Sequence, residues 1–344
     1  MIESVRARAL LLSALLCALV AHSHAETPDR VFRLGTGGIG GTYFPIGSLL
    51  SQAISAPRNS DDVPAGSVVG GLLVVPQISN GSIANVRDVR KGILDGALVQ
   101  ADVAHWAYQG TGMFSTGPAH ARLRALGYLY AESLHLVASV ESGIRSVADL
   151  RGRRVSLDES GSGTLHDAVL ILGYYGIDLS DIRPTYLKPT FAARALASGD
   201  LDAFFIFAGY PAAAVSQLAG TAGARLVGIE GAAIDAVLTS HPYFDRGVIP
   251  AGIYGAGIIP AGMYKGNGDT PTLTVGAQLV VTDRLSEELA YQMTRALWHE
   301  RTMRLVTEGH PKGVEIDPRS ALNGVTLPLH PGAARYYREV GLLD

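Results

Sequence analysis

Apolar and polar positions along this chain follow a repeated order of strand, turn and helix. Residues 31–34 form a short apolar run that predicts a strand, and apolar side chains between residues 46 and 54 recur at helical spacing. A glycine-rich turn lies between them, with five glycines among residues 35–41. The same order returns at residues 154–175, around a second turn at residues 158–164. Strands that alternate with helices predict an α/β fold.

The remaining apolar pattern predicts further elements of both kinds. Strands are expected at residues 72–76, 96–100, 123–130, 135–140, 202–207, 226–229 and 274–282. Helices are expected after residue 82, at residues 147–152 and 191–198, after residue 286 and at residues 332–340. Residues 132–133 are expected to form a turn between two strands, and residues 56–71 a flexible loop. Ser79 or Asn80 is expected to cap the helix that follows it, and Ser286 to cap a later one.

The first glycine-rich turn has the chemistry of an anion-binding site. Glycines leave backbone N–H groups uncovered, and the start of the following helix adds unpaired N–H groups with a partial positive charge. Gly35, Gly37 and Gly40 match the spacing of the dinucleotide fingerprint, but residues 55–62 form a polar loop where that motif needs a strand ending in an acidic residue. No Lys-Ser or Lys-Thr pair follows, as a phosphate-binding loop requires. A cradle for a small carboxylate or phosphate is favoured over a role in packing alone.

Composition indicates an exported protein and narrows its chemistry. A basic start, an apolar run at residues 9–21 and a small-residue cleavage site at residues 23–25 predict a secretory signal peptide over residues 1–25. The mature chain would hold no cysteine, because Cys17 is the only one in the sequence. A net charge of −3 argues against a nucleic-acid partner. The histidines form no metal-binding motif, so neither a metal nor a cofactor is expected.

Polar residues follow the first three expected strands. Thr42 and Tyr43 come after the first strand, Asn80 after the second, and Gln100 and Asp102 after the third. Because ligands of open parallel sheets gather at the carboxyl ends of strands, we expect these five side chains at one cleft. For Asp102, helix capping or a structural hydrogen bond is favoured over contact with an amino group of the ligand.

The second turn contains a serine with two possible roles. Ser162 lacks the preceding glycine of the Gly-x-Ser-x-Gly motif of serine hydrolases, so that motif fails. Ser162 alone suits a helix cap as well as a ligand contact, and the recurrence of the strand, turn and helix order favours the ligand. His166 is expected to be exposed or locally bonded, with a position facing the cleft left open.

Residues 249–254 recur as residues 259–264 with a single change. One copy is expected to be an insertion in a surface loop, and a role at the mouth of the cleft stays open.

Several motifs, taken in order, resemble those of the TAXI solute-binding proteins, the periplasmic receptors of one class of TRAP transporters. The first is Gly35-Thr36-Gly37-Gly38 with residues 43–47, and the others are residues 80–85 with 92–95, 100–102, 108–112, 142–144 with 149–155, 160–163, 202–205 and 249–252. Each motif is weak alone, but together they extend across most of the mature chain.

The resemblance implies two α/β lobes of the type II periplasmic-binding-protein fold, joined by a hinge, with a central ligand cleft. With two expected strands as the crossings, lobe I would comprise residues 26–132 and 270–344, and lobe II residues 133–269. The resemblance also implies a TRAP membrane permease as partner and a ligand such as glutamate, glutamine or a related dicarboxylate or oxoacid. The Asp158-Glu159 pair and Ala101 differ from residues common in the family, which concerns the ligand more than the fold.

We therefore expect a periplasmic, monomeric receptor that closes its lobes on a small anionic solute. Backbone N–H groups and the hydroxyls of Thr42, Ser162 and Thr164 would bind a carboxylate, and Tyr43 and Phe207 would supply apolar walls. The expected ligand-binding residues are Gly41, Thr42, Tyr43, Asn80, Gln100, Asp102, Ser160, Ser162, Gly163, Thr164, Phe207 and Gly209. The alternatives are a secreted α/β enzyme that uses the two turns for a phosphate-bearing cofactor, and a receptor that feeds a sensor.

Overall fold

The structure is a computed structural model that describes residues 28–56, 64–219, 223–255, 257–259 and 268–344. The expected signal peptide, most of the second copy of the repeated hexapeptide, and residues 57–63 of the expected flexible loop lie outside the described residues.

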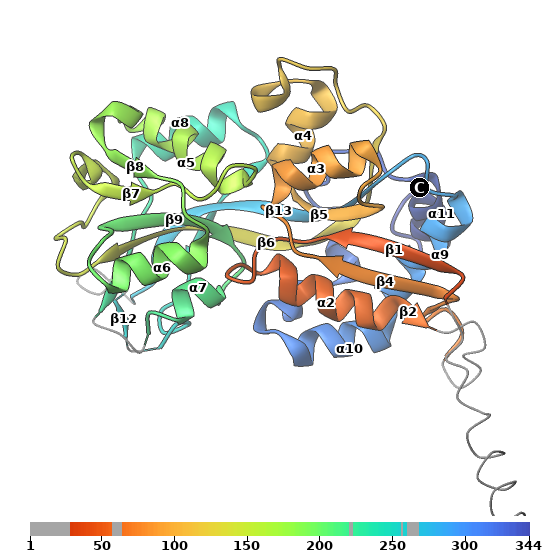
Figure 1. The fold of residues 1–344 in the computed structure, drawn as a ribbon. Helices are drawn as coiled ribbons and strands as arrows, with labels where there is room; N and C mark the ends of the chain where they lie inside the picture. Colours follow the sequence, from red (N-terminus) through yellow and green to blue (C-terminus); the bar gives the residue numbers. More distant parts are fainter. Residues whose placement is uncertain (1–27, 57–63, 220–222, 256, 260–267) are drawn as a thin grey trace, which may run out of the picture.

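One sheet runs through the described part of the molecule (Figure 1). Its strands follow the order β3-β2-β4-β1-β5-β13-β6-β9-β7-β8, with β10 beside β6, β12 beside β10, and β11 beside β13. The strands are β1 (Arg30–Gly35), β2 (Ser55–Ala56), β3 (Val69–Gly70), β4 (Leu72–Gln77), β5 (Gly96–Gln100), β6 (Leu123–Ser139), β7 (Arg154–Ser156), β8 (Arg183–Thr185), β9 (Ala203–Ala208), β10 (Ala224–Val227), β11 (Phe244–Ile249), β12 (Ile258–Ile259) and β13 (Thr270–Thr282).

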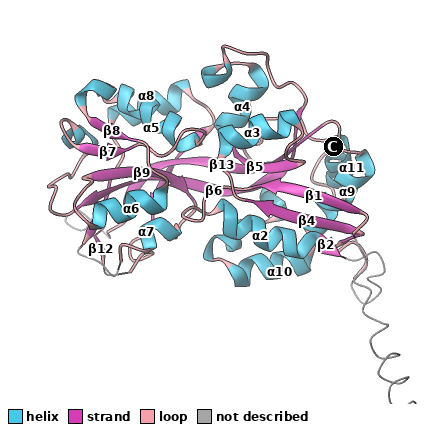
Figure 2. Cartoon of the chain, viewed as in Figure 1, coloured by secondary structure: helices cyan, strands magenta, loops and turns pink. Residues whose placement is uncertain are grey.

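Helices cover both faces of this sheet (Figure 2). The α-helices are α2 (Tyr43–Ile54), α3 (Ser82–Lys91), α4 (Ala101–Gln109), α5 (Gly163–Tyr174), α6 (Pro189–Ala197), α7 (Ala213–Ser216), α8 (Ala232–Ser240), α9 (Glu287–Leu297), α10 (Glu300–Gly309) and α11 (Pro331–Glu339). Short 3₁₀ helices are η1 (Gly112–Phe114), η2 (Val147–Leu150), η3 (Leu179–Asp181), η5 (Pro311–Glu315) and η6 (Pro318–Ser320). The expected α/β architecture is confirmed.

Two long strands join two lobes. β6 has 17 residues and β13 has 13, and they pair antiparallel through the middle of the molecule (Figure 1). On one side β13 continues its pairing with β5, and on the other β6 pairs with β9 and β10. Because both strands pass from one lobe to the other, the expected crossings are present, and the boundaries after residues 132 and 269 remain predictions.

Each lobe buries apolar side chains on both faces of its part of the sheet. In the first lobe, Ile46 of α2 lies in one buried cluster and Val86 of α3 in another. In the second lobe, Ala168 of α5 and Ala193 of α6 likewise lie in separate clusters. The helical stripes of the sequence therefore face the sheet, as amphipathic helices do when a core covers one side of them.

The turn expected at residues 132–133 is wrong, because β6 runs unbroken through it. Glu132 faces Val275 of β13 in register, and Ser133 faces Thr274 of β13 and Ala208 of β9. Two adjacent polar residues favour a turn only when they reach solvent. Here both are buried, and tertiary contacts replace the water that a turn would have offered them.

The cap expected from Ser79 or Asn80 is also wrong. Gly81 occupies the N-cap of α3, and no side chain caps that helix. The Ser79 hydroxyl instead donates to the carbonyl of Thr36 at 2.8 Å, which ties the end of β4 to the first glycine turn. The cap expected from Ser286 is confirmed, since its Oγ accepts the N–H of the third residue of α9 at 3.3 Å.

Candidate functional site

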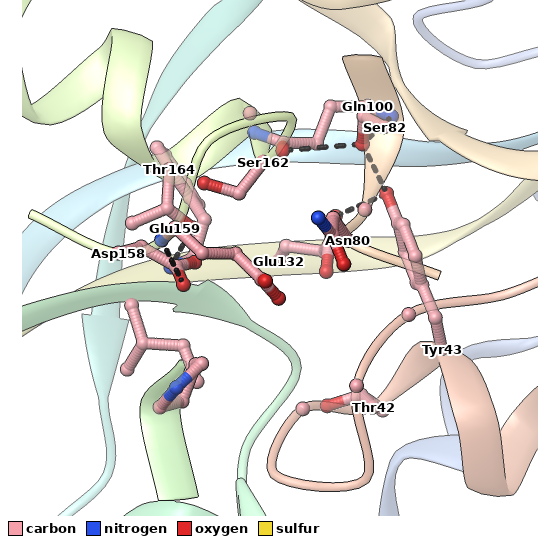
Figure 3. A pocket seen from close by; sticks show the side chains of 18 residues that line it. Thr42, Tyr43, Asn80, Ser82, Gln100, Glu132, Asp158, Glu159, Ser162 and Thr164 are labelled. Carbon is pink, nitrogen blue, oxygen red and sulfur yellow. Dashed lines mark hydrogen bonds between the residues drawn. The ribbon is translucent and has the colours of Figure 1, made fainter. Parts of the chain in front are cut away.

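A cavity with about 60 Å³ of free space lies between the two lobes. The first lobe supplies the glycine turn before α2, the start of α3 and the end of β5, and the second supplies the turn before α5 and the end of β9. Figure 3 shows the labelled side chains around it, with Thr42 and Tyr43 opposite Asp158 and Thr164. The lining residues are Gly37, Gly38, Gly41, Thr42, Tyr43, Asn80, Gly81, Ser82, Gln100, Glu132, Asp158, Glu159, Ser162, Gly163, Thr164, Pro189, Ile206 and Phe207.

Most of the expected ligand-binding residues meet at this cavity, although their role in binding remains a prediction. Those that line it are Gly41, Thr42, Tyr43, Asn80, Gln100, Ser162, Gly163, Thr164 and Phe207. Asp102, Ser160 and Gly209 are not among its lining residues. His166 does not line it either, and its ring packs edge-on against Trp106 with the centroids 4.7 Å apart.

Three helices begin at the cavity, which gives it a source of positive potential. The N-caps of α2, α3 and α5 are Thr42, Gly81 and Ser162, and all three residues line the cavity. The first N–H groups of a helix have no partner within that helix, and they carry a partial positive charge. No side chain caps α2 or α3. A small anion held between the lobes would therefore meet N–H donors from both sides.

The three hydroxyls expected to bind the ligand already make hydrogen bonds in the protein. Thr42 donates to the carbonyl of Gly209 in the other lobe at 2.7 Å, so its proton is committed to the lobe interface. Ser162 caps α5 as an acceptor, and Thr164 Oγ1 accepts the N–H of Phe207 at 3.0 Å. Because they act as acceptors in these two bonds, Ser162 and Thr164 keep a proton, which the Asp158 carboxyl or a ligand can accept.

A chain of hydrogen bonds connects side chains of the first lobe to one another and to the second. The Tyr43 hydroxyl donates to Glu132 Oε2 at 2.7 Å and lies 3.5 Å from Ser82 Oγ. Ser82 Oγ donates to Gln100 Oε1 at 3.3 Å and accepts the Gln100 N–H at 3.1 Å (Figure 3). Gln100 Nε2 then donates to Asp167 of α5 at 2.8 Å, so Gln100 links the two lobes.

Three carboxyl groups that were not predicted as site residues line the cavity. Glu132, Asp158 and Glu159 are lining residues, and no lysine, arginine or histidine is among the lining residues that the structure describes. Burial raises the pKa of Glu132 to about 8 and that of Asp158 to about 7. Glu159 lies 3.3 Å from the ammonium of Lys188, which offsets its charge.

Asp102 has a structural position at the lobe interface rather than a place in the cavity. Asp102 of α4 and Asp167 of α5 are both fully buried, and the Asp102 carboxyl raises the cost of ionising Asp167. Burial and this proximity raise the pKa of Asp167 well above its usual range, whereas burial raises the pKa of Asp102 and a hydrogen bond from Asp167 lowers it. Asp102 does not cap α4, and its structural role remains a prediction.

Several direct contacts hold the lobes together around the cavity. The N–H of Ala84 donates to the carbonyl of Gly161 at 3.0 Å, and the N–H of Ala214 donates to the carbonyl of Gly40 at 2.9 Å. Asn80 Nδ2 donates to the carbonyl of Ser160 at 3.2 Å. These contacts hold the two turns against the opposite lobes at the edge of the cavity.

Sequence reasoning missed the three carboxyl residues of the cavity. Glu132 was assigned to a turn, and Asp158 and Glu159 were noted only as departures from the pattern of the TAXI proteins. The available signal was a single carboxyl in an apolar run between residues 123 and 140, because a charged residue in a buried strand needs a partner or a function.

Comparison with known proteins identifies the family of this chain. The profile of the NMT1-like family matches residues 34–257 and 255–341, which together span most of the chain. The chain belongs to the NMT1-like family. Within this NMT1-like chain, both glycine- and serine-rich turns and the strands β6 and β13 lie inside the matched regions.

Named relatives of this NMT1-like protein include binding proteins and a transporter component. A putative aliphatic sulfonates-binding protein of Escherichia coli K12 is 36% identical over 83 residues, which is 24% of this chain and 25% of that protein. A solved structure described as a periplasmic transporter has 13% identity and a TM-score of 0.51, and the match covers 91% of this chain and 93% of that one. The alkanesulfonate-binding protein SsuA of Xanthomonas axonopodis pv. citri, bound to MOPS, has 18% identity and a TM-score of 0.46, with 91% and 94% covered.

These comparisons support the expected fold and location, but not every expectation from the sequence. The two-lobed α/β fold of type II periplasmic-binding proteins is confirmed. The named proteins are described as binding or transport proteins, and one of them as periplasmic, in agreement with the expected location. The comparisons do not extend to the TAXI subfamily or to a TRAP permease. Among the described residues, no helix has the length and apolar character to cross a membrane.

Proposed function

We propose that this chain is a periplasmic receptor that closes its two lobes on a small solute and delivers it to a membrane permease. The observation that carries the proposal is the cavity between the lobes, which is lined by two strand–turn–helix corners about 120 residues apart in the sequence. The loaded and empty receptors would differ in lobe arrangement, so that a permease could distinguish them through differential affinity.

The ligand bears at least one carboxylate, which the N-terminal N–H groups of α2, α3 and α5 bind as they would any small anion. From the resemblance to TAXI proteins, a glutamate- or glutamine-like amino acid, a dicarboxylate or an oxoacid is the finer assignment, and a TRAP-type permease is the partner. The hydroxyls of Ser162 and Thr164 would add donors from the second lobe.

A second candidate is a solute with a sulfonate group. The 36% identity to a putative aliphatic sulfonates-binding protein over 83 residues favours it. A sulfonate would use the same helix N-termini, because it also presents negatively charged oxygens to N–H donors. The cavity chemistry described so far therefore serves both candidates, and a ligand screen has to separate them.

Calorimetry and thermal shift on the mature protein test this function. The panel comprises the common amino acids, dicarboxylates, oxoacids and alkanesulfonates. We expect one of these classes to bind. Ser162→Ala should weaken binding by about 5- to 10-fold through loss of a hydrogen bond to the ligand, and Thr42→Val by a similar factor through loss of its bond to Gly209, which holds the lobes together. If both variants bound the ligand as tightly as the unaltered protein, the cavity would not be the binding site.

A further inference from the structure

The cavity brings together groups of opposite electrostatic character. The starts of α2, α3 and α5 supply backbone N–H groups, which favour negative charge, although those of Ala84 and Leu165 already bond to Gly161 and Ser162. Glu132 and Asp158 supply carboxyl groups to the same space. An anion alone would satisfy the N–H groups, but it would oblige the two carboxyl groups to stay protonated, because ionised carboxyl groups in the same cavity would repel it.

Glu132 is held in place and has an oxygen available to a ligand. The residue is 3% exposed, and it lines the cavity from the middle of β6. The Tyr43 hydroxyl donates to Oε2 at 2.7 Å, which fixes the orientation of the carboxyl group. Oε1 has no hydrogen-bond partner among the residues that the structure describes. Oε1 is not among the fully buried side-chain atoms that lack a partner in the described residues, so it is open to the cavity and can accept a hydrogen bond from a ligand.

Asp158 adds a second carboxyl from the opposite lobe. It is 6% exposed and adopts a left-handed backbone conformation with φ of 76°. Its Oδ1 accepts the N–H of Glu159 at 2.7 Å, and hydrogen bonding from Thr164 and Ser162 partly offsets the rise in its pKa. The two carboxyl groups therefore reach the same cavity from different elements, β6 and the turn after β7.

The lysines near the cavity are committed to other groups. Lys188 lies 3.3 Å from Glu159 and donates to Asn80 Oδ1 at 3.3 Å. Lys312 lies 2.5 Å from Glu315, and its ammonium stands 3.8 Å above the ring of Tyr210. Neither lysine lines the cavity or forms an ion pair with Glu132 or Asp158 among the described residues, although the charge of Lys312 lowers the pKa of Glu132.

From this arrangement we propose that the ligand carries a protonated amine, which Glu132 and Asp158 bind while the helix N-termini bind its acidic group. The proposal rests on the receptor function above and specifies its ligand as a zwitterion. An ammonium group donates to carboxylates in strong charge-assisted hydrogen bonds, and it removes the repulsion that a simple anion would meet. The acidic group is a carboxylate or a sulfonate, since both fit the N–H donors.

The free space also favours a compact ligand. About 60 Å³ is available with the lobes in this arrangement, which corresponds to about four water-sized positions. A short amino acid or aminoalkyl sulfonate fits with little movement, whereas glutamate requires the lobes to part slightly. The apolar wall formed by Ile206 and Phe207 suits a short carbon chain between the charged ends.

Matched pairs of ligands that differ by the amine test the proposal by calorimetry. The pairs are L-alanine and propionate, L-glutamate and glutarate, and taurine and ethanesulfonate. In the pair that binds, the amine-bearing member should bind about 10- to 100-fold more tightly, the range expected for hydrogen bonds to charged groups. The pair itself distinguishes a carboxylate ligand from a sulfonate ligand.

Variants of the two carboxyl residues locate the amine. Glu132→Gln keeps an acceptor for Tyr43, and Asp158→Asn suits the left-handed backbone, which asparagine tolerates. Each should lower affinity for the amine-bearing ligand at least about 10-fold and leave the weaker, amine-free partner unchanged or slightly tighter. Glu141→Gln is the control, because Glu141 is an exposed carboxyl just beyond β6 that does not line this cavity. Circular dichroism of each variant excludes unfolding as the cause.

Proton release gives an independent measurement. Burial raises the pKa of Glu132 to about 8, so this group carries a proton at pH 7 in the empty site. Binding an ammonium would expel that proton, and calorimetry in two buffers of different ionisation enthalpy would detect the release. Binding of a simple anion would instead retain or take up protons. Proton uptake with the tightest ligand would contradict the proposal.

Failure of the zwitterion proposal can be distinguished from failure of the receptor function. Equal affinity for glutamate and glutarate, or for taurine and ethanesulfonate, would overturn the amine subsite while the receptor function stood. Unchanged affinity in both Glu132→Gln and Asp158→Asn would do the same. Absence of binding by every member of the three pairs and of the wider panel would count against both.

Discussion

The two turns that face each other across the cavity share a local design but differ in charge. Each follows a strand and starts a 12-residue helix, α2 in one lobe and α5 in the other. The turn before α2 has no acidic or basic residue, whereas the turn before α5 contains Asp158 and Glu159. Ser162 caps α5 with its side chain, and Thr42 leaves α2 without such a cap and bonds to the opposite lobe.

This difference shows how one supersecondary unit serves two tasks. The neutral turn offers backbone donors and ties the lobes together through the hydroxyl of Thr42. The acidic turn is anchored by its own helix cap, and it can therefore present a carboxyl group without help from the other lobe. The comparison predicts that changes at the second turn affect the pH dependence of the protein more than changes at the first.

The largest expected effect comes from adding one methyl group at the second turn. A Cβ at Gly163 would lie 1.8 Å from Gln100 Oε1 across the lobe interface. Gly163→Ala should therefore obstruct closure and weaken ligand affinity by about 10- to 100-fold, the equivalent of about 1–3 kcal/mol of overpacking. Calorimetry with the ligand found in the screen measures the loss.

Gly173→Ala is the matched control on the same helix. A Cβ at Gly173 meets nothing within 4 Å, and alanine is a better helix former than glycine by about 1 kcal/mol. This variant should bind normally and unfold at a slightly higher temperature. Equal affinity in the Gly163 and Gly173 variants would show that the lobes do not close as the structure has them.

The next effect is a pH dependence that arises at the acidic turn. Burial is the main reason that the pKa of Asp158 is raised to about 7, and the negative charge of Glu159 adds to it. A carboxyl whose folded-state pKa is raised stabilises the fold at low pH and loses that contribution as pH rises through the folded-state value. The free energy of unfolding should therefore fall between about pH 4, near the ordinary pKa of an aspartate, and about pH 7, at up to about 1.4 kcal/mol per pH unit for this group.

Asp158→Asn should flatten this decline, because asparagine does not titrate. Urea unfolding at pH 5 and pH 7, without ligand, compares the two slopes. Glu132, with a pKa raised to about 8, contributes a decline across this range in both proteins. An identical change in unfolding free energy for the variant and the unaltered chain would mean that Asp158 is ionised throughout.

The smallest effect concerns the ion pair at the edge of the cavity. Lys188 pairs with Glu159 at 3.3 Å, and its side chain is 43% exposed. Exposed ion pairs contribute about 0–1 kcal/mol and are screened by salt. Lys188→Ala should lower affinity less than about 5-fold at low ionic strength, with the difference shrinking as salt is added. A large loss that persists in high salt would place Lys188 in direct contact with the ligand.

Local patterns were enough to predict most elements and the convergence of the two turns. The apolar runs at β1, β4 and β5 and the glycines before α2 and α5 carry their signal in short stretches. Strands that end in polar turns meet at one edge of a parallel sheet, so Thr42, Asn80 and Gln100 came together as expected. The resemblance to TAXI proteins added the two-lobed arrangement, which the fold confirms.

Predictions failed where a residue's environment depends on distant parts of the chain. Glu132 and Ser133 are polar neighbours that suggested a turn, yet β9 and β13 bury them inside one strand. The hydroxyl of Thr42 was expected to face the ligand, but Gly209, 167 residues away, accepts its proton. Asp102 follows a strand end like its neighbours, although its side chain is buried against α5 and lies outside the cavity.

The sequence alone determined the periodic elements and the bare glycine turns, because backbone preference and apolar spacing are local properties. Only the tertiary structure decided the charge of the cavity. Whether a carboxyl group faces solvent, a neighbouring strand or a ligand depends on which segments pack around it. The carboxyl group of Glu132 is oriented by a hydrogen bond from Tyr43, nearly ninety residues earlier in the chain.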